Sequence, residues 1–193
     1  NTEYDKTHAD RFTVDGKSIT MEEDVQFAHY DPNVASLMQL GKWFDYMREN
    51  GVYDNTRIIL VADHGRGLYL NWDRVIDNGP DTDFFFPLLM VKDFNAKGFS
   101  FSDTFMTTAD VPTLATSGLI DNPTNPFTGN AINANAKYDR PFYAFMSYDW
   151  DTSKNNGNQF FPGTWYRVDN QNARDKRNWV MVGENTVLPD ALR

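Results

Sequence analysis

The first strongly periodic stretch of the chain is residues 31–51, DPNVASLMQLGKWFDYMRENG. Its apolar residues recur at steps of three, four and three, the spacing of one buried helix face: Leu37, Leu40, Phe44 and Met47. Asp31 is placed to cap such a helix, Pro32 suits its first position, and Gly51 follows its end. The pattern therefore predicts an α-helix over this stretch.

The pattern changes at residues 57–62, RIILVA, where apolar side chains follow one another without alternation. Consecutive apolar residues are typical of a strand covered on both faces, as in a parallel sheet flanked by helices. Residues 84–93, FFFPLLMVKD, predict a second buried strand. A helix that leads through a short turn into a buried strand is half of an α/β unit.

The rest of the first two thirds is more irregular. Residues 1–32 are polar and loop-like, with a turn at VDGKS and a short helical turn at MEEDVQ. Residues 102–119 predict a loop and then a short helix, with Gly118 past its end. Residues 120–137 are rich in Pro, Asn and Gly and predict a long surface connection.

Three short β-rich runs follow, at residues 140–150, 163–170 and 178–183. Turn residues separate them, which predicts a small antiparallel sheet. The expected fold class is therefore α/β, with a mixed sheet flanked by helices and a small C-terminal antiparallel sheet.

Composition narrows the classes of function. A chain of 193 residues with 40% apolar residues suffices for one domain with its own core. The net charge of −9 argues against binding nucleic acid or an anionic membrane surface through general electrostatics. Because the chain has no cysteine, disulfides, cysteine–zinc sites and thiol nucleophiles are excluded.

Asp63 and His64 end the apolar run at residues 57–62 and are the principal candidates for chemistry. At the end of a strand the chain already turns, so neighbouring side chains can converge, and Gly65 and Gly67 permit a sharp turn. A carboxylate with an imidazole suits zinc, manganese or a similar divalent ion. The alternative is an ordinary turn in which Asp63 caps a backbone amide and His64 is merely exposed.

Several motifs resemble the sulfatase and alkaline-phosphatase superfamily, in the order and with the gaps of that family. The segment GVYDNTRIILVADHGRG resembles its Asp-His-Gly segment, preceded by a similar helix in residues 31–51. FFFPLLMVKDF and SDTFMTTADVPTLATSGL are similar to the strand and helix that follow, and NPFTGNAI resembles the membrane-anchored branch of lipoteichoic-acid synthases and phosphoethanolamine transferases. The resemblance covers residues 1–136, which would form the C-terminal portion of a sulfatase-like α/β domain. Residues 137–193 would be a small β extension packed on it.

The resemblance implies transfer or hydrolysis of phosphate or sulfate esters with a divalent metal: Mn, Zn, Mg or Ca. Asp63 and His64 match the metal pair of the family. His8, in DKTHAD, resembles a histidine near the substrate ester, although Ala9-Asp10 departs from the family pattern; an exposed histidine is the alternative. Arg66 is a candidate to hold substrate oxygens, with an ordinary surface arginine as the alternative. His29 is expected to pack or cap near the start of the helix.

No residue of the chain matches the family's nucleophile, which lies well upstream of the Asp-His-Gly motif. We therefore expect a fragment that binds metal weakly and turns over nothing alone. The resemblance implies an extracytoplasmic enzyme, anchored in the membrane at full length, whose ester substrate is a lipid headgroup or a glycan. A truncated sheet would also leave an exposed edge, through which the chain could form a homodimer.

Two other hypotheses remain open. A sulfatase of the same superfamily would carry the same Asp-His pair. A non-catalytic glycan-binding module would use the aromatic residues of the last third, for which packing in a small sheet is the more ordinary account. These residues are Trp150, Phe160, Phe161, Trp165, Tyr166 and Trp179.

Overall fold

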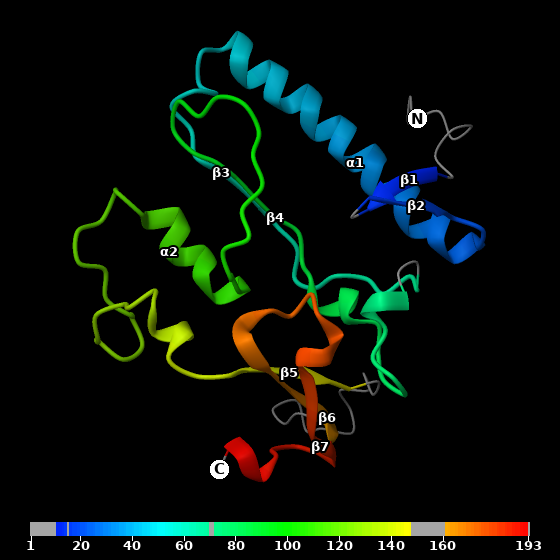
Figure 1. Ribbon diagram of the computed structural model, residues 1–193. Helices are drawn as coiled ribbons and strands as arrows, with labels where there is room; N and C mark the ends of the chain where they lie inside the picture. The colour runs from blue at the N-terminus through cyan, green and yellow to red at the C-terminus, as the bar shows by residue number, and fades with distance from the viewer. Residues whose placement is uncertain (1–10, 15, 70–71, 148–160, 193) are drawn as a thin grey trace.

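The computed structural model of the chain describes residues 11–14, 16–69, 72–147 and 161–192. Within these residues the fold is mixed α/β, with two α-helices and three small antiparallel sheets (Figure 1). The helices are α1 (Asp24–Glu49) and α2 (Val111–Thr116). The strands are β1 (Arg11–Val14), β2 (Lys17–Thr20), β3 (Ile58–Val61), β4 (Leu89–Lys92), β5 (Phe142–Met146), β6 (Gly163–Val168) and β7 (Trp179–Thr186).

Helix α1 begins at Asp24, seven residues before Asp31. The predicted start at Asp31 is therefore wrong. Glu23 and Gln26 form a capping box, so the helix starts there and runs through Pro32. Its end is confirmed, because Gly51 follows with a φ of 68°, a conformation that favours glycine. Only part of the predicted stripe is buried: Met47 is 5% exposed, whereas Leu37 is 48% exposed.

The polar N-terminal segment is more regular than predicted. Strands β1 and β2 form an antiparallel hairpin around a turn at Gly16, where the sequence predicted only a loop with a turn. The predicted helical turn at MEEDVQ is the beginning of α1. Helix α2 with Gly118 beyond it, at a φ of 71°, and the exposed connection that follows are confirmed.

Strands β3 and β4 pair antiparallel, with Ile59 opposite Val91 and Leu60 opposite Met90. The expectation of a parallel partner for β3 is therefore wrong. The described part of their connection holds short 3₁₀ turns and an isolated bridge, without the α-helix that usually forms the crossover of a parallel pair. Nor is either strand fully covered, because Val61 is 44% exposed and Val91 is 45% exposed.

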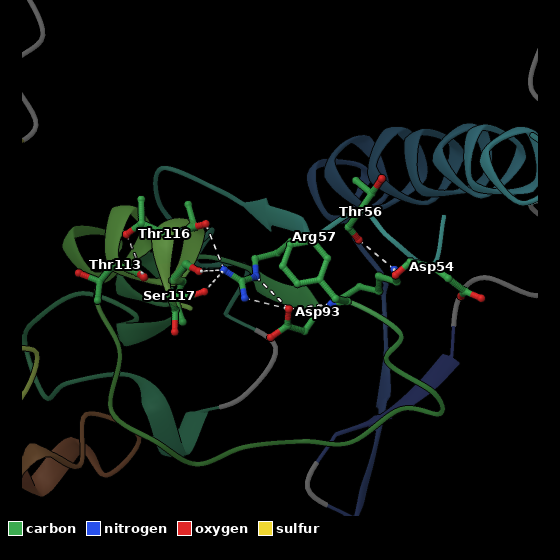
Figure 2. Close-up of polar contacts among 11 residues, drawn as sticks. Asp54, Thr56, Arg57, Asp93, Thr113, Thr116 and Ser117 are labelled. Atoms are coloured by element: carbon green, nitrogen blue, oxygen red, sulfur yellow. Dashed lines mark hydrogen bonds and ion pairs between the residues drawn. The ribbon is translucent and has the colours of Figure 1, made fainter. Parts of the chain in front are cut away.

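Arg57 ties this pair of strands to α2 (Figure 2). Its side chain is 11% exposed, and its guanidinium donates to the carbonyl oxygens of Leu114, Ala115 and Ser117, at 3.0, 3.1 and 2.7 Å. The same group donates from Nε to Asp93 just beyond β4, at 3.0 Å. One cation thus satisfies the carbonyl oxygens at the C-terminus of α2, which have no partner within the helix.

The predicted C-terminal sheet is confirmed, with β6 between β5 and β7. Its core contains Ala144, Tyr166, Val168 and Trp179. Phe85 packs against this core, with its ring centroid 5.0 Å from that of Trp179. The sheet is therefore joined to the segment between β3 and β4, and Figure 1 shows β3 leading from the end of α1 toward it.

The chain exposes much apolar surface. Its accessible area is 13935 Å², compared with about 9,400 Å² expected for a compact protein of this mass. Trp43 and Tyr46 of α1 and Met90 of β4 are among the large side chains at least 39% exposed. The homodimer through an exposed sheet edge stays a prediction.

A largely buried ion pair joins Asp110, just before α2, to Lys137, at 3.0 Å. The Asp110 side chain is 13% exposed, and its carboxylate also accepts from the backbone amide of Thr107, at 2.7 Å. Burial alone would raise the pKa of Asp110, but the hydrogen bonds from Thr107 and Lys137 outweigh it and lower the pKa below 3.8. The ionised form is thus the one that the fold stabilises.

The lowered pKa of Asp110 predicts that the wild type and a variant without this carboxylate differ in stability at pH values above the acid range. A lowered folded-state pKa contributes stability that is full above the unfolded pKa and is lost as the pH falls through the folded one. The free energy of unfolding of the wild type should exceed that of Asp110→Asn above about pH 5, and the gap should shrink below about pH 4. Chemical denaturation at a series of pH values measures it, with exposed Asp121→Asn as the control. A gap that does not change with pH would contradict the assignment.

Candidate functional site

Asp63 and His64 lie where β3 ends, just after the last backbone hydrogen bond of the pair, from Ala62 to the Leu88 carbonyl oxygen at 2.9 Å. Both side chains reach solvent, at 89% exposed for Asp63 and 62% for His64. Asp63 Oδ1 accepts a hydrogen bond from the His64 backbone amide, at 2.9 Å. This is the capping contact of the ordinary-turn interpretation, and the second carboxylate oxygen, Oδ2, takes no part in it.

The His64 ring lies in an orientation that a metal ligand could use. Its Nδ1 is 2.6 Å from the carbonyl oxygen of Gly65. In the tautomer that donates this bond, the lone pair is on Nε2, as in histidines that bind metals. Nε2 lies 3.9 Å from Asp63 Oδ2, and a small movement would bring the two atoms to the roughly 3.4 Å that separates two ligands of a tetrahedral ion with bonds of about 2.1 Å. The two side chains therefore converge, and their donor set fits a borderline divalent cation.

Gly65 and Gly67 place this loop directly on the 3₁₀ turn η3 (Thr82–Phe85). The Gly65 amide donates to the Phe84 carbonyl oxygen, at 2.9 Å. A Cβ at Gly65 would overlap the carbonyl oxygen of Asp83 and lie 2.6 Å from that of Phe86. A Cβ at Gly67 would lie 2.6 Å from the Phe84 ring. The two glycines are needed because no side chain fits between the loop and the turn.

Asp81 holds the two segments together from inside. It is fully buried, at 0% exposed, and caps η3 by accepting from the Asp83 amide at 3.0 Å. Its other oxygen accepts from the Tyr69 amide at 2.9 Å, across from the Asp-His-Gly loop. Asp81 is not among the predicted site residues, although aspartate is a preferred residue at the N-cap of a helical turn.

Two more elements fix the loop. The Gln26 side chain, buried in the first turn of α1, donates to the Leu68 carbonyl oxygen at 3.2 Å. Phe85 of η3 packs on Trp179 of the C-terminal sheet. Residues distant in sequence thus meet at the loop from α1, from η3 and, through η3, from β7.

The other predicted site residues are less closely associated with Asp63 and His64. Arg66 is exposed and stacks its guanidinium over the Phe84 ring, 5.7 Å from the centroid. His8 lies outside the described residues. His29 lies within α1, where its backbone carbonyl accepts from the Asn33 side chain.

A complete metal cage is not formed by the described part of the chain, which holds no cluster of three or more His, Asp or Glu residues able to bind an ion. The described residues also contain no helix with the length and apolar character needed to span a bilayer. In comparisons with known proteins, no family model, curated protein or solved structure matches the chain.

The two glycines of the loop carry a stability prediction. Gly65→Ala should lower the free energy of unfolding by at least about 2 kcal/mol, because its Cβ meets backbone atoms that cannot move aside. Gly67→Ala should cost less, since its Cβ meets side-chain atoms of Phe84 and Asp81 at 2.6–2.9 Å and no backbone atom. Chemical denaturation provides the measurement.

Gly41→Ala is the matched control, because Gly41 lies inside α1 with no atom within 4 Å of the added Cβ. It should be stabilising by about 0.5–1 kcal/mol, the helix preference for alanine. Equal effects at Gly65 and Gly41 would show that the loop does not lie against η3.

Proposed function

We propose that this chain is part of a divalent-metal-dependent enzyme that transfers or hydrolyses phosphate or sulfate esters. The observation that carries the proposal is the convergence of Asp63 Oδ2 and His64 Nε2, 3.9 Å apart at the open end of β3. The ordered resemblance of residues 1–136 to the sulfatase and alkaline-phosphatase superfamily supports it. That resemblance also favours action at the cell envelope on a lipid headgroup or a glycan.

The residues of the chain have separate roles in this proposal. Asp63 supplies a charged oxygen and His64 a neutral nitrogen, two of the ligands that a catalytic site needs. A divalent cation held there would polarise the ester oxygens and stabilise the charge that develops on them. Because the loop is fixed by Gly65 and Asp81, the two ligands need little reorganisation to bind.

Arg66 is proposed to orient the substrate. Its guanidinium lies over the Phe84 ring, 5.7 Å from the centroid, and the Arg66 side chain is exposed. The edge of a guanidinium binds two oxygens of a phosphate or sulfate group at once. His8 remains a proposed neighbour of the ester.

The aromatic tail gives less support to a glycan-binding module. Tyr166 and Trp179 are buried in the core of the C-terminal sheet, as the packing interpretation predicts. Trp165 packs against Phe145 and donates its indole N–H to the Thr186 carbonyl oxygen, at 3.2 Å. Trp150 and Phe160 lie outside the described residues.

Mn²⁺ titration of the isotope-labelled chain, followed by NMR, tests the metal site. Paramagnetic broadening should begin at the amides of residues 63–67 and at the His64 ring, even if binding is weak. Asp63→Asn should remove this local broadening, whereas Asp121→Asn, an exposed acid elsewhere, should leave it intact. Broadening that persists in the Asp63→Asn variant, or the lack of broadening at residues 63–67 in the wild type, would refute the metal site.

In the full-length protein, the same Asp63→Asn variant should lower turnover of a phosphate or sulfate ester by about 100-fold or more. Assays with matched nitrophenyl phosphate and nitrophenyl sulfate would separate the two substrate classes. Unchanged turnover of both esters would contradict the proposed function even if Mn²⁺ binds.

A further inference from the structure

The structure contains a polar cleft of about 470 Å³. It lies between η2 (Trp72–Arg74) and the segment leading into η8 (Lys176–Asn178). Its walls carry three bases and two acids: Arg174, Lys176, Arg177, Asp73 and Asp175, together with Asn172. It shares no residue with the Asp63–Gly67 loop. In a chain of net charge −9, this excess of bases is a local exception.

The walls of the cleft are fixed by hydrogen bonds. Lys176 Nζ reaches across to the Val75 carbonyl oxygen at 3.0 Å and to Asp77 Oδ1 at 3.1 Å, which joins the two sides. Asp175 caps η8 by accepting from the Arg177 amide at 3.0 Å. The site is thus shaped before any ligand enters.

Arg177 is held in place by only some of its N–H donors. Its Nε and Nη2 donate to Asp175, the shortest bond being 2.6 Å. The Arg177 side chain and amide lower the pKa of Asp175 to about 2, so the carboxylate stays ionised and remains paired. The Nη1 group of Arg177 takes no part in this pairing.

Arg174 makes the fewest polar contacts of the three bases in the cleft among the described residues. Its only ion pair among the described residues is to Asp103, at 3.6 Å, and Asp103 is itself 93% exposed. Among those residues it makes no hydrogen bond, so the donors of its planar fork are open to solvent. An arginine fork of this kind matches two oxygens of a tetrahedral anion.

We propose that this cleft binds the phosphate or sulfate group of a small soluble molecule, with Arg174 as the principal donor and Arg177 Nη1 as the second. The acidic character of the whole chain disfavours docking on an anionic membrane surface, which points to a soluble ligand. The proposal uses none of the residues of the proposed metal site and stands without it.

The test is titration with inorganic phosphate at constant ionic strength, with sodium chloride as the reference. The Nε–H signals of Arg174 and Arg177 should shift with saturation under phosphate and not under chloride. Arg174→Gln should weaken binding about tenfold, the effect of losing a charge-assisted hydrogen bond. The phosphate affinity of Arg174→Lys should lie between those of the wild type and Arg174→Gln, because lysine keeps the charge but lacks the planar guanidinium.

Arg140→Gln, an exposed arginine outside the cleft, is the matched control and should bind phosphate like the wild type. Shifts that grow linearly without saturation, or equal affinity in Arg174→Gln, would overturn the proposal. Phosphatidylglycerol vesicles should not retain the chain, and retention that depends on Arg174 would contradict a soluble ligand. Because Mn²⁺ binding is measured at other residues, the two proposals can fail independently.

Discussion

The contact between Gly65 and the backbone of residues 83–86 is the constraint on which the geometry of the site depends. At that point two segments approach so closely that no side chain fits between them. The approach turns the chain immediately after β3, and this turn brings the side chains of Asp63 and His64 to the same side. Elsewhere along a strand, neighbouring side chains would point to opposite faces. Asp81 maintains the approach from the buried side.

The sequence predicted local elements better than their partners. The end of α1 at Gly51, helix α2 and the three C-terminal strands could be predicted because glycine, turn residues and β-branched residues act locally. The start of α1 was missed because Pro32 is an obvious start signal, whereas the capping box at Glu23 is a weaker one that the structure uses. The antiparallel pairing of β3 was missed because an apolar run reports burial and says nothing of strand direction.

The candidate site was predictable only in its exposed part. Asp63, His64 and the need for glycine at position 65 follow from the motif itself. The supports could not be predicted, because Gln26, Asp81 and Trp179 act through contacts between segments far apart in sequence. Nor could sequence pattern bring Arg174 to a cleft with Asp73, since this depends on Lys176 bridging two segments.

The most direct test of the central claim is anomalous diffraction from crystals of the chain soaked in Mn²⁺. The claim is that the glycine-backed turn holds an acid and an imidazole to one cation. It predicts an anomalous peak about 2.1–2.3 Å from both Asp63 Oδ2 and His64 Nε2, with the loop still lying on η3. A loop in the same position with no peak there, or with manganese bound only at other carboxylates, would contradict the account.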